Sequence, residues 1–258
     1  MTFDDLATGG ATLVIPADWH TGRGAFGGLA AGAALRAIAA QASGSARSFQ
    51  CTFLAPPVGA QQIRVASIRA GTQVSFWSAD LLDERGRVTV HATATFGAAR
   101  TAPGSARWAP PQVPSAPPPP LHPPAPIGPG APPFTQHVQF VPSLGGLFVG
   151  TSAARFGGWT RLAAPTTPDA ALVVALLDAW PPAALAAQAG PPTRGQAAAT
   201  VTLEVHFVAD PAALGGDGWG FVEVVGVTND DGYSSQDSNL WSRSGALLAR
   251  SRQLVAML

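Results

Sequence analysis

Apolar and polar residues follow the same order of patterns twice along the chain. In each half, a nearly continuous apolar stretch precedes four segments in which apolar and polar residues alternate. A long apolar stretch predicts a buried helix, and alternation with period two predicts strands that bury one face. The predicted helices span 25–42 and 168–180. The predicted strands span 48–54, 63–70, 74–83 and 88–96 in the first half, and 199–208, 220–227, 233–242 and 247–257 in the second.

The segment 200–207 (TVTLEVHF) shows the strand pattern most clearly. Strict alternation places Val201, Leu203, Val205 and Phe207 on one face of the strand and Thr200, Thr202, Glu204 and His206 on the other. The polar face is expected to meet water, a partner or a site. Gly86 and Gly245 each lie between consecutive predicted strands, where hairpin turns favour positive φ. The sheet is therefore predicted to be antiparallel.

Local sequence matches indicate that the two halves are copies of one repeated domain. The segment SFQCTFLAPP around Phe53 parallels TLEVHFVADP around Phe207. Residues 101–133 hold more than half of the 25 prolines. Proline fixes φ and removes a backbone donor, so this stretch predicts a linker without helix or sheet. The predicted division is 1–100, linker 101–133, and 134–258.

A helix wrapped by an antiparallel sheet, occurring twice, is the hotdog arrangement. The predicted fold class is therefore α+β, a double hotdog whose two halves pack as a pseudo-dimer. Open sheet edges in such folds pair between subunits, so we also expect a homo-oligomer.

Composition excludes several other classes. The 258 residues are 47% hydrophobic and 12% charged, which is unlike a disordered chain. Fifteen basic and fifteen acidic residues cancel, so no overall field favours nucleic acid. Cys51 stands alone and the five histidines are scattered, so neither a disulfide framework nor a metal site is expected. With no secretory signal and no apolar stretch of ~20 residues, we expect a cytoplasmic protein that spans no membrane.

Three polar residues stand out, although each has a routine interpretation. Asp178 ends the apolar stretch ALVVALL and is either a water-exposed helix end or a site residue with partners. Thr200 fits an ordinary strand position, and Gln253 fits a routine amide hydrogen bond. Glu204 and His206 share a face but stand ~6 to 7 Å apart along the strand, so no direct hydrogen bond between them is expected.

Seven segments together resemble the TesB-like acyl-CoA thioesterase II group of double-hotdog thioesterases. They are AFGGLAAGAALRA (25–37), SFQCTFLAPP (48–57), GRVTVHATATFGA (86–98), GWTRL (158–162), LLDAW (176–180), ATVTLEVHF (199–207) and ARSRQLV (249–255). The resemblance implies hydrolysis of an acyl-CoA thioester without a cofactor. It also implies that Asp178, Thr200 and Gln253 orient and activate a water. Thr202 and Leu203 stand where the family typically has an Asp-His pair, which bears on efficiency and substrate range.

The expected chemistry needs a base for the water and donors for the growing negative charge on the carbonyl oxygen. Asp178 is the expected base. Gly27 and Gly28, at the start of the first helix, are expected either to offer backbone N–H groups to the oxyanion or to allow close helix packing. Two alternatives stay open: a catalytically degenerate acyl-CoA-binding or assembly protein, and a hotdog hydratase or dehydratase. The latter needs a paired Asp and His on one helix.

Overall fold

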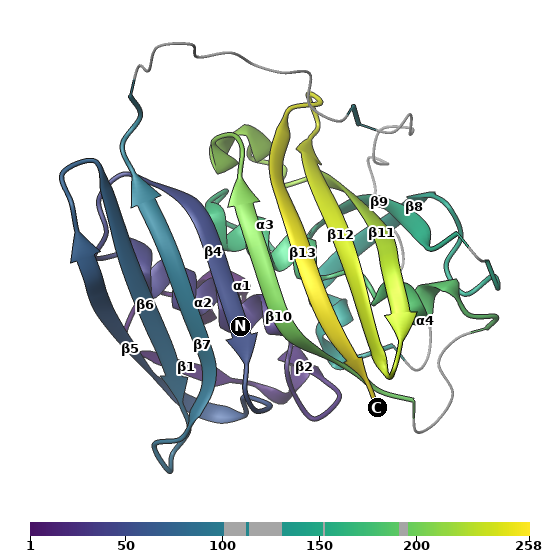
Figure 1. The fold of residues 1–258 in the computed structure, drawn as a ribbon, viewed down its shortest axis with the longest axis horizontal. Coiled ribbons are helices and arrows are strands. Elements are labelled where there is room, and N and C mark those ends of the chain that lie inside the picture. The colour runs from purple at the N-terminus through teal and green to yellow at the C-terminus, as the bar shows by residue number, and fades with distance from the viewer. Residues whose placement is uncertain (101–111, 114–130, 152, 191–195) are drawn as a thin grey trace.

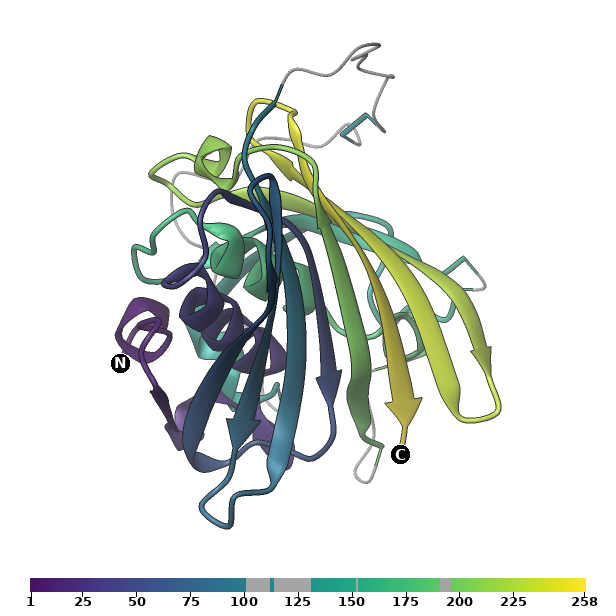
Figure 2. The same ribbon diagram turned by 60° about the vertical axis from the view of Figure 1, so that its left-hand side comes forward.

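The computed structural model describes residues 1–100, 112–113, 131–151, 153–190 and 196–258. One antiparallel sheet of eleven strands runs through the described residues, and the helices cover one of its faces (Figures 1 and 2). The strand order is β1-β5-β6-β7-β4-β10-β13-β12-β11-β9-β8. The predicted α+β double hotdog is confirmed.

The N-terminal half supplies one end of the sheet and its main helix. Its helices are α1 (Phe3–Leu6) and α2 (Gly27–Ala39), with the short 3-10 helix η1 (Ala17–Trp19). Its strands in the large sheet are β1 (Thr12–Ile15), β4 (Ser45–Phe53), β5 (Gly59–Ala70), β6 (Val74–Leu82) and β7 (Val88–Gly97). The strands β2 (His20–Thr21) and β3 (Gly24–Ala25) form a separate hairpin.

The C-terminal half repeats this arrangement. Its helices are α3 (Ala170–Asp178) and α4 (Ala183–Ala187), with the 3-10 helices η2 (Pro133–His137) and η3 (Pro211–Leu214). Its strands are β8 (Val138–Leu144), β9 (Arg155–Leu162), β10 (Ala198–Phe207), β11 (Gly220–Asp230), β12 (Tyr233–Ser242) and β13 (Leu247–Met257). The eight predicted strands are all present, whereas β1, β8 and β9 lie outside the predicted set.

The two halves join in the sheet and again in the helical layer. In the sheet, β4 pairs antiparallel with β10, and Gln50 lies opposite Glu204. On the helix-covered face of the sheet, α2 and α3 pack closely because small residues line the contact between them. A Cβ at Gly28 would lie 2.8 Å from Ala175 Cα, and one at Gly32 would lie 3.4 Å from Ala171 O. The N-terminal end of each helix therefore lies beside the C-terminal end of the other.

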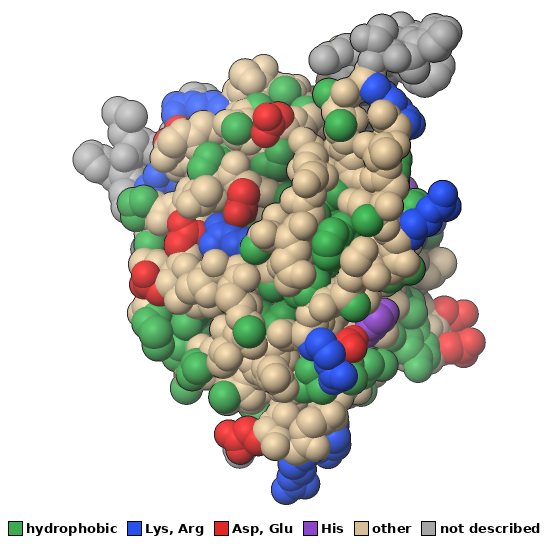
Figure 3. Space-filling model, turned by 90° about the vertical axis from the view of Figure 1, so that its left-hand side faces the viewer, with side chains coloured by type: hydrophobic (Ala, Val, Ile, Leu, Met, Phe, Trp, Pro, Cys, Tyr) green, Lys and Arg blue, Asp and Glu red, His purple; other side chains and the backbone are tan. Residues whose placement is uncertain are grey.

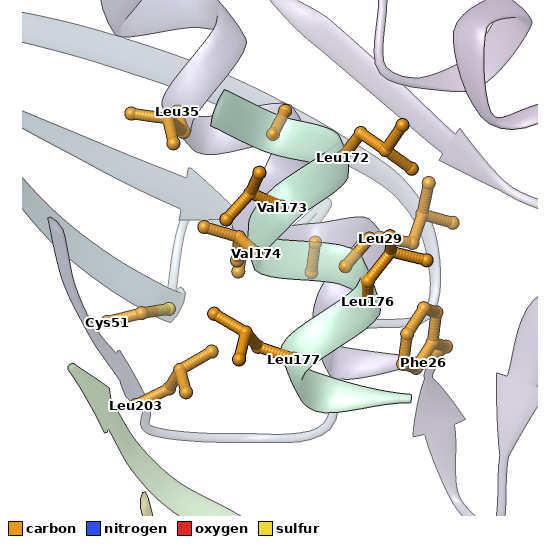
Figure 4. Packing of buried hydrophobic residues seen from close by; sticks show 14 of the residues in the cluster. Phe26, Leu29, Leu35, Cys51, Leu172, Val173, Val174, Leu176, Leu177 and Leu203 are labelled. Atoms are coloured by element: carbon orange, nitrogen blue, oxygen red, sulfur yellow. The ribbon is translucent and has the colours of Figure 1, made fainter. Parts of the chain in front are cut away.

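Buried apolar side chains fill the space between the helices and the sheet. Figure 4 shows Cys51 of β4 and Leu203 of β10 near Val174 and Leu177 of α3. All four side chains are buried. The helices are apolar almost all round because they pack against each other and against the sheet.

Local sequence fixes both ends of α3. The Asp169 side chain accepts a hydrogen bond from the Leu172 N–H, which is the usual N-cap arrangement. Pro181 and Pro182 follow the helix and cannot continue it. This stop leaves Asp178 as the last helical residue.

Strict alternation in β10 is corrected by the structure. The pairing with β13 shifts register between Thr200 and Thr202, so that Thr200 lies opposite Val255 and Thr202 lies opposite Leu254. An extra residue in one strand reverses the faces that follow it. Thr200 therefore faces the helices together with Leu203, whereas strict alternation had placed it on the opposite face from Leu203, with Thr202.

The sequence predicts no membrane-spanning segment. The described stretch long and apolar enough to cross a membrane is Ala170–Ala187, which contains α3 and α4, and 67% of it is buried inside the protein.

Most of the predicted linker 101–133 lies outside the described residues, and the domain boundaries stay a prediction. On the face seen in Figure 3, acidic and basic side chains are interspersed with apolar ones.

Candidate active site

Asp178 lies where the C-terminal end of α3 meets the N-terminal end of α2. Its carboxylate accepts a hydrogen bond from the Gly28 N–H. The first N–H groups of a helix have no partner within that helix, and the α2 N-cap residue Phe26 offers no side-chain acceptor. Asp178 of one half thus caps the helix of the other half.

Gln253 connects Asp178 to Thr200. Its Nε2 donates to Asp178 Oδ1 at 2.8 Å and to Thr200 Oγ1 at 2.6 Å. Gln253 lies on β13 and faces the helices, and only 6% of it is exposed. The structure therefore brings together the three residues that the sequence singled out, from α3, β10 and β13.

Gln236 is a further polar residue of this cluster that the sequence analysis did not single out. It lies opposite Gln253 on β12, and only 1% of it is exposed. Its Nε2 donates to Gln253 Oε1 at 2.8 Å, and its Oε1 accepts from the Ala183 N–H at 2.7 Å. Both faces of β12 carry polar residues, so alternation gave no signal that this glutamine is buried.

Burial is the main influence on the Asp178 carboxyl. It raises the pKa of Asp178 to about 7, while the hydrogen bonds from the Gly28 N–H and the Gln253 amide act in the opposite direction. Burial likewise raises the pKa of the Cys51 thiol, and the nearby Asp178 charge adds to this effect. A carboxyl that titrates near neutral pH is suited to take up and release a proton.

The two glycines at the start of α2 both lie against Asp178. The Gly28 N–H is used by the carboxylate. A Cβ at Gly27 would lie 2.7 Å from Asp178 Oδ2 and 3.1 Å from the Phe53 ring. Glycine at position 27 is therefore required for space at the carboxylate.

The remaining candidates lie apart from this cluster. His206 Nε2 and Glu204 Oε1 lie 3.3 Å apart, within ion-pair range, on the exposed face of β10, but they form no hydrogen bond that would contradict the prediction. Long side chains span a distance that the backbone spacing alone does not. Among the described residues, no three His, Cys, Asp or Glu side chains form a group that could hold a metal ion.

The N-terminal half shows a related position without these polar groups. Leu35-Arg36-Ala37 of α2 parallels Leu177-Asp178-Ala179 of α3. Arg36 Nε lies 2.7 Å from Asp169 Oδ2 at the start of α3, as Asp178 contacts the start of α2. Arg36 also pairs with Asp4 at 2.7 Å, and its Nη1 donates to the Ala7 carbonyl at 2.9 Å.

The strands carry the same correspondence. β4 has a register shift between Ala46 and Ser48, like the shift in β10 between Thr200 and Thr202. Phe49 lies opposite Ala94, just as Leu203 lies opposite Gln253. The positions that match Thr200 and Gln253 therefore hold Ala46 and Ala94. In the described residues, the hydrogen-bonded cluster occurs on one side of the pseudo-symmetry.

The fold and this cluster define a double-hotdog protein with a buried carboxyl at the helix interface. Two protein-family models match the sequence and identify its family. The acyl-CoA thioesterase N-terminal domain matches residues 15–97, and the acyl-CoA thioesterase C-terminal domain matches residues 110–257. The chain belongs to the acyl-CoA thioesterase family. No curated protein matches it.

Solved structures show the same fold over the whole chain. A conserved protein of unknown function with a hot dog fold from Alicyclobacillus acidocaldarius is 26% identical, with a TM-score of 0.83 over 99% of this chain and 97% of that chain. A putative thioesterase II from Thermobifida fusca is 22% identical, with a TM-score of 0.81 over 100% and 98%. The acyl-CoA thioesterase II TesB2 from Mycobacterium marinum is 18% identical, with a TM-score of 0.70 over 96% and 92%.

Proposed function

We propose that this protein hydrolyses acyl-CoA thioesters to a free acid and CoA, with Asp178 as the base that activates water. The observation that carries the proposal is the Gln253 amide, which bonds Asp178 and Thr200 at 2.8 and 2.6 Å. Membership in the acyl-CoA thioesterase family supports the substrate class.

The hydrogen bonds suggest a division of roles among the three side chains. The two amide hydrogens of Gln253 are both used, so Gln253 positions the other two side chains and leaves the water to them. Thr200 Oγ1 accepts from Gln253, which leaves its hydroxyl proton free to bond a water or a carbonyl oxygen. Asp178 retains acceptor sites for a water proton.

The reaction then proceeds by direct attack of water. Asp178 takes a proton while the water oxygen bonds to the thioester carbon, which gives a tetrahedral oxyanion. The C–S bond breaks as the carbonyl re-forms, and the leaving sulfur takes the proton from Asp178. The Gly27 N–H, at the first helical position of α2, is the proposed donor to the oxyanion because Gly28 already serves Asp178.

The test measures free CoA released from a panel of acyl-CoAs with a thiol reagent. The wild-type protein is expected to release CoA, and Asp178→Asn to lose at least about a thousandfold in kcat because a general base is gone. Asp237→Asn, on the outer face of β12, is the control and is expected to keep full activity. Tight acyl-CoA binding without turnover by the wild-type protein would instead support the degenerate binding protein.

Activity is also expected to depend on pH through Asp178. The base must be deprotonated, and the pKa of this carboxyl is raised to about 7. The value of kcat/KM should therefore fall about tenfold per pH unit below pH 7 and level off above it. A profile that stays flat down to pH 5 would exclude Asp178 as the base.

A further inference from the structure

We propose that Gln236 is a positioning residue that fixes the direction of the Gln253 amide. This inference rests on the proposed hydrolysis and adds a fourth side chain to the same site. Gln236 does not touch Asp178 or Thr200 through any observed bond; it acts on them through Gln253.

A chain of hydrogen bonds runs from the Ala183 backbone N–H through Gln236 and Gln253 to the site. The Ala183 N–H donates to Gln236 Oε1 at 2.7 Å, and Gln236 Nε2 donates to Gln253 Oε1 at 2.8 Å. Gln253 Nε2 then donates to Asp178 and Thr200. Both glutamines are buried, so water does not readily replace these partners.

The Ala183 N–H, as the first donor, sets the donor-to-acceptor direction of the whole hydrogen-bond chain. A backbone N–H can only donate, so the group of Gln236 that faces Ala183 must be its carbonyl oxygen. The Gln236 nitrogen then faces Gln253 and requires an acceptor there. This requirement turns the Gln253 oxygen toward Gln236 and its nitrogen toward the site.

A reversed Gln253 amide would oppose the proposed chemistry. Its oxygen would face Asp178 Oδ1, and two acceptors at the observed 2.8 Å separation repel each other when the carboxyl is ionised. The carboxyl would then favour its protonated form, and a smaller fraction of it would be ionised and able to act as the base at neutral pH. The fixed amide direction therefore keeps Asp178 available to take a proton.

Few other groups near Asp178 complicate a pH measurement. On β4, burial and the nearby Asp178 charge both raise the pKa of the Cys51 thiol, so the thiol stays protonated. On β10 and α2 the contacts come from the Thr200 hydroxyl and the Gly28 N–H, which do not titrate. Arg36 bonds the opposite end of α3, at Asp169.

The first test is Gln236→Met, which keeps the side-chain length and removes both polar groups. We expect kcat to fall about tenfold or more with little change in KM, since one buried hydrogen bond that orients the site is lost. The rising limb of the pH profile should also move to higher pH, because the bond from Gln253 lowers the pKa of Asp178.

The matched control is Gln61→Met. Gln61 is also fully buried, where its Nε2 donates to the Val58 carbonyl at 2.7 Å and its Oε1 accepts from Thr89 at 2.7 Å. It lies on β5, away from the site. This variant is expected to lose stability and to keep the wild-type pH profile. If Gln236→Met only lowers stability in the same way, the positioning role is wrong.

The second test is Gln236→Glu, which covers the case in which the methionine variant does not fold. A protonated glutamic acid can accept from Ala183 and donate to Gln253, as glutamine does. An ionised one cannot donate, so Gln253 would reverse. We expect the pH profile to gain a falling limb on the alkaline side. A profile of unchanged shape would overturn the proposal.

The titration of Asp178 itself, followed by carbon NMR of labelled aspartate, separates this proposal from the proposed function. If the wild-type protein releases no CoA, the proposed function fails. The positioning role is then supported if Asp178 titrates at higher pH in Gln236→Met than in wild type, and is overturned if the two titrations coincide.

Discussion

At the residue scale, Asp178 combines a buried position with several donors. Removal from water disfavours the charged carboxylate, and so does the C-terminal end of α3, where the helix dipole is negative. The Gly28 N–H at the N-terminal end of α2 and the Gln253 amide favour it. The pKa near 7 is the balance of these opposing influences, and it makes the ionised residue a cost to folding that grows from about pH 4 to about pH 7.

This cost is measurable as a pH-dependent stability difference between wild type and Asp178→Asn. Folding raises the pKa of Asp178, so the wild-type fold loses stability as the pH rises from the unfolded value near 4 to about 7. Relative to wild type, the variant should gain about 1.4 kcal/mol per pH unit across this range. Urea unfolding at pH 5, 6 and 8 measures the difference, and a constant difference would contradict the raised pKa.

At the element scale, the start of α2 and the bulge in β10 shape the site. The bulge turns Thr200 toward the helices, where Gln253 reaches it. The start of α2 presents Gly28 to the carboxylate, and it does so only because Gly27 leaves room beside Asp178. The bulge of β10 thus places a side chain of that same strand, and the start of α2 holds the Asp178 side chain of α3.

Gly27→Ala tests this close approach. The added Cβ would lie 2.7 Å from Asp178 Oδ2, so the carboxylate must move, whereas the ring of Phe53 can shift. We expect kcat/KM to fall about a hundredfold with little change in melting temperature. The matched control is Gly216→Ala, because a Cβ there meets no atom within 4 Å. Wild-type activity in Gly27→Ala would show that the carboxylate position is not critical.

At the scale of the whole molecule, the two pseudo-symmetric positions at the ends of α2 and α3 have different roles: one holds the proposed catalytic residues, and the other holds a structural ion-pair cluster. One end of the interface between α2 and α3 carries Asp178 and its donors. The other end carries Arg36, whose side chain connects α1, α2 and the start of α3. Its side chain is only 12% exposed, while the exposed fractions of the partners Asp4 and Asp169 are 32% and 34%. Arg36 is therefore expected to matter for stability alone.

Arg36→Met should lower the free energy of unfolding by about 2 kcal/mol, since two partly buried carboxylates lose their partner. CoA release per folded molecule should stay at the wild-type value. Arg252→Met is the control: Arg252 is 70% exposed and pairs with Asp237, so its loss should cost less than about 1 kcal/mol. Reduced activity of the folded Arg36 variant would contradict a purely structural role.

The sequence by itself determined the repeated order of helix and strands, because period and turn residues are local properties. It also singled out Asp178, Thr200 and Gln253, although alternation assigned Thr200 to the wrong face. The bulge that corrects this face depends on the pairing of β10 with β13, which are distant in sequence. Likewise, only the tertiary structure decided that Gln236 is buried beside Gln253. The direction of both amides follows from the Ala183 N–H, which long-range packing brings to them.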